Sequence, residues 1–431
     1  MVLDRPFRAV LEKEVKGLSF LNVRMEQGLV DVFVQDGKII EIAPTGQKSP
    51  VGRLYDADGG FISPPFADPH LHLDAALLCL SAPNHSGTLK EGIENWSRCR
   101  SEMSEVDLIE RASTALKWCV SNGVTRIRTH VDTSSKMAVE TLVAFRDEVS
   151  HLAELQVVAF PQEGVMGTTA HQEALAWAAA AGVDCVGAIP HHERTVSEGD
   201  DSIRLAFDLA EKHALQVDLH CDETDNPDSR HIFTVCRERL KRDFGSHVTA
   251  GHCTAMHSYP EDIAKHAIDE IVESGVQVIA NPLDNIVLQG RQDHYPKRRG
   301  ITRVPELIEA GAMVGVGHDS ILDPWYPLGM GRILDAASML VHVTQMTRPD
   351  QIQRVFQLLV DDNHIGFGGA PDVSVGSRAD FLIHSVSDVS TLMRTKSAPR
   401  WVVHRGVVVA ETHPVNSFVL DEAIRPGVLP E

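Results

Sequence analysis

The sequence predicts an α/β protein: a (β/α)8 TIM barrel with a small β-sandwich-like domain built from both chain ends. Three observations indicate this fold. Eight short β-rich apolar runs alternate with longer amphipathic, helix-like runs. His, Asp, Glu or Gln stands at the carboxyl end of nearly every β-rich run. The two chain ends instead carry the signals of β-hairpins.

The eight β-rich runs are the predicted barrel strands. In chain order they read GGFISPPFADPHLH, VTRIRTHVD, LQVVAFPQ, VDCVGAIPHH, LQVDLHCDE, HVTAGHC, VQVIANP and MVGVGHD. Helix-like segments such as DSIRLAFDLAEKHA lie between them, which implies parallel strands with crossover helices. Eight such units close a barrel, whereas an open doubly wound sheet is the alternative. The polar strand ends favour the barrel, because a barrel gathers all of them around one mouth.

Both chain ends are predicted to build the small β-domain. Two β-like runs in GLVDVFVQDGKIIEIAP flank Asp36-Gly37, a hairpin signal, and WVVHRGVVVAE has a similar pattern around Arg405-Gly406. We assign residues 1–62 plus 372–431 to this domain, with a structural role, and residues 63–371 to the catalytic barrel.

Charge and hydropathy exclude several classes of protein. The 431-residue chain has a formal net charge of -20, which argues against nucleic acid as a partner because phosphate backbones are repelled. No apolar run approaches the roughly 20 residues needed to span a bilayer. The first residues lack the long apolar core of a secretory signal. The sequence therefore predicts a cytoplasmic protein with neither a membrane nor a nucleic acid partner; homo-oligomer formation is left open.

Histidines at the strand ends predict a metal site. His70 and His72 are two residues apart, so on a strand they point to the same side. An isolated HxH is more often a polar loop, but His220, His252 and Asp319 also end β-rich runs. Imidazole and carboxylate ligands suit one divalent ion, Zn²⁺ or Fe²⁺. No lysine ends the fourth run, so a carbamylated lysine between two metals is not indicated.

Longer motifs resemble those of the amidohydrolase superfamily, and within it those of the bacterial cytosine deaminases. The stretches that carry the resemblance cover the whole barrel: PPFADPHLHLD, SGTLKEGIENW, VVAFPQEG, HCDETD, AGHCTAMHSY, ANPLDNIVLQGR, YPKRRGITRV and GHDSILDPWYPLG. The resemblance implies a set of four metal ligands, His70, His72, His220 and Asp319.

The resemblance also implies roles for the catalytic and substrate-binding residues. Glu223 is similar to the family's proton-shuttling glutamate, and His252 to the histidine that orients or activates the metal-bound water. Gln162 corresponds to the amide that reads the substrate, Trp325 lines the pocket, and Leu89 belongs to the loop that covers the substrate. On the residues alone, Gln162 could instead cap a helix and Trp325 could be ordinary barrel packing.

These residue types fit the hydrolysis of an amino group from an aromatic ring. A bound metal lowers the pKa of water from about 15.7 to about 7, which gives hydroxide at neutral pH. His252 and Asp319 can take or hold its proton, while Glu223 can protonate the ring nitrogen and then the leaving amine. The amide of Gln162 offers a donor beside an acceptor, which matches the ring carbonyl and N–H of a pyrimidinone.

One departure from the family pattern bears on the choice of substrate. Ser320 follows the metal-binding aspartate where the related deaminases have a second acid. A smaller, uncharged residue is expected to open apolar-tolerant space near the 5-position of the ring. The sequence therefore predicts a deaminase of a free pyrimidine base, cytosine or 5-methylcytosine, that forms uracil or thymine plus ammonia. The alternatives are a deaminase of isocytosine, a triazine or another amino-azine, and a catalytically dead relative that acts as a scaffold.

Overall fold

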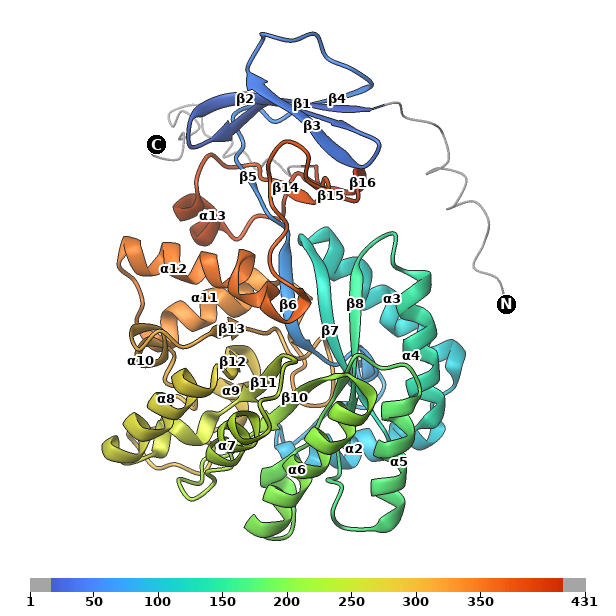
Figure 1. The fold of residues 1–431 in the computed structure, drawn as a ribbon, viewed down its shortest axis with the longest axis vertical. Coiled ribbons are helices and arrows are strands. Elements are labelled where there is room, and N and C mark those ends of the chain that lie inside the picture. Colours follow the sequence, from blue (N-terminus) through green and yellow to red (C-terminus); the bar gives the residue numbers. More distant parts are fainter. Residues whose placement is uncertain (1–16, 414–431) are drawn as a thin grey trace.

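The computed structural model describes residues 17–413, so the two outermost parts of the predicted small domain, residues 1–16 and 414–431, lie outside the described residues. Eight parallel strands form one sheet in the order of the chain, which confirms the predicted (β/α)8 barrel (Figure 1). They are β6 (Phe66–Leu71), β7 (Val124–Asp132), β8 (Glu154–Phe160), β9 (Cys185–Val186), β10 (Gln216–Cys221), β11 (Val248–His252), β12 (Gln277–Ala280) and β13 (Val314–Val316). The sheet closes where Leu71 pairs in parallel with Asp319.

Helices surround the strands, and polar caps start several of them. The side chains of Thr88, Ser104, Ser135, Thr168 and Thr195 each accept a backbone N–H of the first helical turn. The helices are α2 (Leu89–Glu102), α3 (Glu105–Ser121), α4 (Lys136–Glu148), α5 (Thr169–Ala180), α6 (Val196–His213), α7 (Ile232–Arg242), α8 (Glu261–Ser274), α9 (Pro282–Leu288), α10 (Val304–Glu309), α11 (Ile333–Thr344), α12 (Pro349–Val360) and α13 (Val389–Thr395). Short 3-10 helices cover Leu78–Leu80, Pro190–His192, Thr254–Ser258 and Asp362–Phe367.

The two faces of each barrel strand differ, as β7 illustrates. Ile127 and Val131 belong to the main hydrophobic core between strands and helices. Arg128 alternates with them and lies inside the barrel, where its guanidinium donates to Asp218 Oδ2 at 2.7 Å. The 3-10 helix Asp362–Phe367 closes the amino end, since the carbonyl of Gly366 accepts hydrogen bonds from barrel glutamines. The interior is therefore filled at its floor and leaves the chemistry to the opposite, carboxyl end.

The small β-domain consists of two four-stranded sheets. One contains β1 (Leu18–Met25), β2 (Gly28–Gln35), β3 (Lys38–Pro44) and β4 (Arg53–Asp56); the other contains β5 (Ile62–Ser63), β14 (Phe381–Ile383), β15 (Trp401–His404) and β16 (Val407–Glu411). The predicted hairpins at Asp36-Gly37 and Arg405-Gly406 are confirmed. Phe20 and Tyr55 of the first sheet pack against Phe381 and Trp401 of the second.

The small β-domain lies at the amino end of the barrel. β5 leads directly into β6, so Figure 1 places the domain beyond the start of the barrel strands, away from their carboxyl ends.

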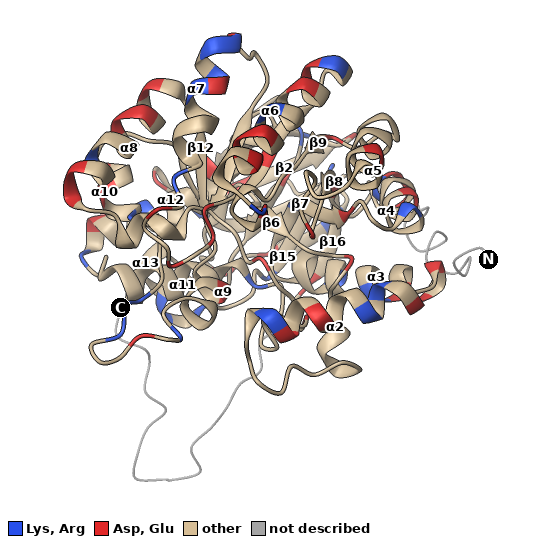
Figure 2. Cartoon of the chain, turned by 90° about the horizontal axis from the view of Figure 1, so that it is seen from below, with Lys and Arg blue, Asp and Glu red and all other residues tan. Residues whose placement is uncertain are grey.

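Figure 2 shows acidic and basic residues together on the outer helices, for example α7 and α8. In the part of the chain that the structure describes, every helix is too short or too polar to cross a membrane.

Candidate metal centre and active site

The carboxyl end of β6 places His70 and His72 in the barrel mouth. The backbone holds this segment against Asp319, because His72 N donates to Asp319 O at 3.0 Å and Asp319 N donates to His70 O at 2.9 Å. Both histidine Nε2 atoms lie 3.5 Å from Asp319 Oδ1. His220, near the end of β10, has its Nε2 3.1 Å from His72 Nε2. The structure therefore brings together all four residues predicted to bind metal.

His130, near the end of β7, is a fifth member that the sequence prediction missed. Its ligand atom lies within 4.8 Å of those of His70, His72 and His220. However, its Nε2 is 3.1 Å from Asp218 Oδ1, and its Nδ1 is 3.4 Å from the carbonyl of Leu71. A neutral ring with its proton on Nε2 donates to Asp218, so His130 is better suited to supporting the cluster than to ligating an ion. The motif THVD at a strand end was the available signal.

The donor set fits a divalent cation. Both ring nitrogens of His70, and Nδ1 of His220, are buried without a hydrogen-bond partner in the described residues. Burial lowers the pKa of His70, His72 and His220 far below the ordinary value, so these rings are neutral and carry free lone pairs. Three neutral imidazoles and one carboxylate are ligands that Zn²⁺ and Fe²⁺ accept.

Glu223 and His252 lie beside this cluster. Glu223 follows β10, and its Oε1 is 3.4 Å from His252 Nδ1, while His252 Nε2 is 3.9 Å from Asp319 Oδ2. Two amides, of Asn281 immediately before α9 and of Asn285 within it, hold the ring of His252, since their Nδ2 atoms lie within 3.3 and 3.0 Å of its nitrogens. Burial raises the pKa of Glu223 to about 8, so the carboxyl is neutral at pH 7 and can donate a proton.

The backbone turns sharply at two of these strand ends. His252 and Asp319 have φ angles of 66° and 69°, in the left-handed region that residues other than glycine rarely adopt. Such conformations cost free energy and cluster at functional sites.

Of the residues predicted to contact substrate, Trp325 lies nearest the cluster in the described contacts. Gln162 lies two residues beyond β8 and is 8% exposed. The indole of Trp325 has its centroid 6.0 Å from that of His72 and 6.1 Å from that of Trp96 on α2, so it lies between the cluster and α2. Leu89 is the first residue of α2 and is partly buried. Its role in covering the substrate stays a prediction.

Ser320 makes a polar contact with a buried carboxyl. Its hydroxyl donates to Asp284 Oδ1 at 2.8 Å, and both residues are buried. The carboxyl that is missing at position 320 is therefore supplied from α9, by a residue that the sequence analysis did not select. Burial and the carboxyls of Asp284 and Glu223 raise the pKa of Asp319 well above its ordinary value. A cation among these groups would offset that cost.

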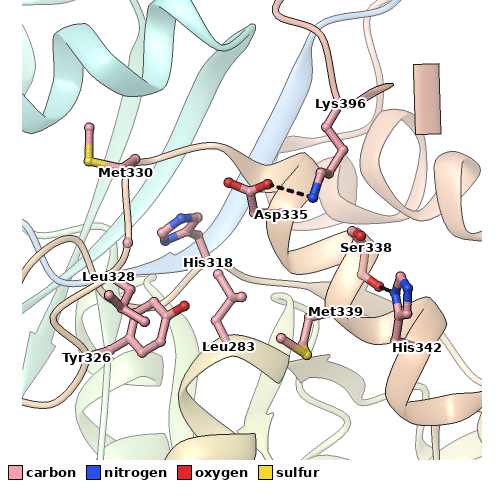
Figure 3. A pocket seen from close by; sticks show the side chains of 11 residues that line it. Leu283, His318, Tyr326, Leu328, Met330, Asp335, Ser338, Met339, His342 and Lys396 are labelled. Carbon is pink, nitrogen blue, oxygen red and sulfur yellow. Dashed lines mark hydrogen bonds and ion pairs between the residues drawn. The ribbon is translucent and has the colours of Figure 1, made fainter. Parts of the chain in front are cut away.

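A separate cavity of about 450 Å³ lies behind the loop that carries Ser320. Figure 3 shows His318, which precedes the metal-ligand candidate Asp319, facing this cavity with Tyr326 and Asp335. Lys396 and Asp335 form an ion pair of 3.6 Å at its edge. Tyr326, Leu328, Gly329 and Met330 of the loop 320–330 thus form one wall of this cavity.

A cluster of imidazoles and carboxyls at the carboxyl mouth of a (β/α)8 barrel defines a metal-dependent barrel enzyme. The profile of the amidohydrolase family matches residues 101–410, and the chain belongs to this family. The 5-methylcytosine deaminase from Klebsiella pneumoniae, solved with 5-fluorocytosine, has a similar structure. The two chains are 35% identical, with a TM-score of 0.88 over 93% of this chain and 99% of that one. The predicted resemblance to the bacterial cytosine deaminases is thereby confirmed.

Two curated relatives are named for other activities. The pterin deaminase of Rhizobium rhizogenes (strain K84 / ATCC BAA-868) is 27% identical over 394 residues, 89% of this chain and 88% of that protein. The N-isopropylammelide isopropyl amidohydrolase of Pseudomonas sp. (strain ADP) is 22% identical over 372 residues, 83% of this chain and 88% of that protein. The comparisons support a deaminase of the amidohydrolase type.

Proposed function

We propose that this protein hydrolyses the amino group of a free pyrimidine base, converting cytosine or 5-methylcytosine to uracil or thymine plus ammonia. The observation that carries the proposal is the position of Glu223, which contacts His252 beside the cluster of His70, His72, His220 and Asp319. The likeness to a 5-methylcytosine deaminase across nearly the whole chain supports the choice of base.

His70, His72, His220 and Asp319 are the residues that would hold one divalent ion, Zn²⁺ or Fe²⁺. When bound, such an ion lowers the pKa of water to about 7 and so supplies a nucleophile at neutral pH.

The protein's own residues move the protons and hold the base. His252, whose ring is fixed by the amides of α9, is placed to take a proton on the side facing Asp319. Glu223, neutral near pH 7, donates to the ring nitrogen next to the reacting carbon and later returns a proton to the departing amine. Gln162 presents an amide donor and acceptor to the ring carbonyl and its neighbouring N–H.

The direct test is a panel of free bases with ammonia detection and metal analysis on the same sample. Turnover of cytosine or 5-methylcytosine is expected, with about one divalent ion per chain. Metal-loaded protein that releases no ammonia from any base in the panel would overturn the proposal and favour a non-catalytic relative.

Preference for the 5-methyl group has its own test, the substitution Ser320→Asp. One methyl in a fitting pocket changes kcat/KM roughly 10–200-fold. The variant is expected to lose activity on 5-methylcytosine more than on cytosine, since a second carboxyl then stands beside Asp284 and the ring 5-position. An unchanged ratio of the two kcat/KM values contradicts the assignment of Ser320 to the pocket wall.

A deaminase of isocytosine, a pterin-like base or another amino-azine is the second candidate. The Ser320–Asp284 hydrogen bond favours it, because this wall is more polar than Ser320 alone predicts. The match to a pterin deaminase over 89% of the chain also supports it. Isocytosine and pterin therefore belong in the same panel.

A further inference from the structure

One face of α9 lines the barrel mouth. Asn281, immediately before the helix, and Asp284 and Asn285 within it stand at positions i, i+3 and i+4, so their side chains share one side. The amides of Asn281 and Asn285 contact the ring of His252 in the candidate active site. Asp284 therefore faces the same region.

Asp284 has one satisfied oxygen and one unsatisfied oxygen. The residue is 1% exposed, and its Oδ1 accepts the hydroxyl of Ser320 at 2.8 Å. Its Oδ2 is buried and has no hydrogen-bond partner in the described residues. Buried polar atoms are nearly always paired, and an unpaired carboxyl oxygen is costly. A ligand that carries an N–H group would supply the missing donor.

The barrel places Asp284 opposite Gln162. Asp284 follows β12 and Gln162 follows β8, and these strands are four apart in the closed sheet of eight. A flat ring between them presents one edge to each residue. If Gln162 reads the ring carbonyl and its adjacent N–H, the opposite edge is the one that bears the reacting amino group.

We propose that Asp284 is a substrate-binding specificity residue whose Oδ2 accepts an N–H of the substrate's exocyclic amine, so that the enzyme selects unsubstituted amino groups over N-alkylated ones. This inference rests on the proposed deaminase function. It applies to cytosine and to the alternative amino-azines alike, because it concerns the amine they share.

The selection follows from the two N–H groups of a primary amine. One points toward the ring nitrogen that Glu223 protonates, and the other points to the far side, where Asp284 stands. An alkyl group on the amine either removes the hydrogen bond to Asp284 or crowds Glu223. Ser320 fixes the orientation of the Asp284 carboxyl through their 2.8 Å hydrogen bond.

The test compares the base that the wild-type enzyme hydrolyses fastest with its N-methylamino counterpart, for example cytosine with N4-methylcytosine. Wild type is expected to prefer the unsubstituted amine. Asp284→Val should lower kcat/KM for the unsubstituted base about 10- to 100-fold, while activity on the N-methyl base changes little. The preference ratio is kcat/KM for the unsubstituted base divided by kcat/KM for its N-methyl counterpart. Asp284→Asn and Ser320→Ala should also lower this ratio, but less than Asp284→Val does.

The control variant is Leu283→Val, one residue away on α9. Leu283 faces the cavity behind the wall (Figure 3), so its substitution is expected to leave the ratio unchanged. Metal content and circular dichroism report whether each variant is folded and loaded.

The outcomes separate this inference from the proposed function. A wild-type enzyme that deaminates no base refutes the proposed function. A wild-type enzyme that is active, with folded Asp284 variants that keep the wild-type preference ratio, refutes the inference alone. If both Asp284 variants fail to fold, Ser320→Ala decides, and an unchanged ratio in that variant overturns the inference.

Discussion

Glu223 combines burial with a position beside His252, and its proton is the one that the proposed reaction needs. Burial raises its pKa to about 8, and the neighbouring His252 Nδ1 is 3.4 Å from its Oε1. Glutamine keeps the shape of the side chain but cannot release a proton. We expect Glu223→Gln to lower kcat at least about 10²–10⁴-fold, the usual contribution of general acid–base catalysis.

Steady-state kinetics and metal analysis of the Glu223→Gln protein check this expectation. The variant should retain its metal, because Glu223 is not among the predicted ligands. Near wild-type turnover would remove Glu223 from the mechanism, and loss of the metal would assign it a different role.

At the scale of single elements, α2 is bonded to residues at the carboxyl ends of two barrel strands. Trp96 Nε1 donates to Asp132 Oδ2 at 2.9 Å at the end of β7, and Arg100 pairs with Asp132 and with Glu163, which follows β8. These contacts fix α2 relative to the predicted substrate residues.

Gly92 allows α2 to approach Trp325 closely. A Cβ atom at this position would lie 2.7 Å from Trp325 Cδ1. We expect Gly92→Val to lower the free energy of unfolding by about 1–3 kcal/mol, the usual cost of overpacking, and to raise KM by displacing the indole. Thermal unfolding and kinetics measure both effects. Glu94→Val, on the exposed side of the same helix, is the control and should leave KM unchanged.

The small β-domain contains a buried carboxyl whose charge stabilises the fold. Burial opposes the charge of Asp380, but hydrogen bonds from His404, Arg405 N and Arg378 outweigh it and lower the pKa of Asp380 to about 2. A depressed pKa contributes stability above the unfolded pKa of about 4, and this stability is lost as the pH falls toward 2. The shift corresponds to about 2 kcal/mol.

Asp380→Asn removes this contribution. Compared with wild type, the variant should be less stable at pH 6, and the difference should shrink between about pH 4 and pH 2. Urea unfolding across this range measures it. A difference that does not depend on pH would mean that the ionised carboxyl is not the stabilising form.

At the scale of the whole molecule, the candidate metal site joins distant parts of the chain. Its ligands come from β6, β10 and the end of β13, and β6 and β13 are the strands whose pairing closes the barrel. An ion bound only by the folded chain stabilises it, by about 4 kcal/mol at 1,000 times its Kd. Removing the metal should therefore lower the melting temperature and abolish activity.

Calorimetry before and after treatment with a chelator, and again after reloading, checks this expectation. His70→Ala should remove most of the metal-dependent change in melting temperature. His266→Ala is the matched control, because His266 is exposed on α8. If the melting temperature of the wild-type protein is the same with and without the metal, the site makes no contribution to the stability of the fold.

Local patterns in the sequence were sufficient for the barrel, for the two hairpins and for the histidines at the strand ends. Each of these depends on periodicity and turn chemistry within a few residues. That His70, His72, His220, His252 and Asp319 meet followed once closure of the barrel was assumed, because closure brings every strand end to one mouth. The choice of His70, His72, His220 and Asp319 as the ligands came from the resemblance to the deaminase family.

Only the tertiary structure decided which neighbours these residues have. His130 belongs to the cluster because Asp218 on another strand fixes its ring, and Asp284 occupies the wall beside Ser320 because α9 turns its polar face inward. Neither partner is near in sequence. The periodicity of apolar residues does not predict how a seven-residue helix is oriented after a strand. Pairings of this kind arise only when helices and strands pack against one another in the closed barrel. The sequence therefore determined which residues stand at the strand ends, whereas packing decided the polar neighbours of the candidate site.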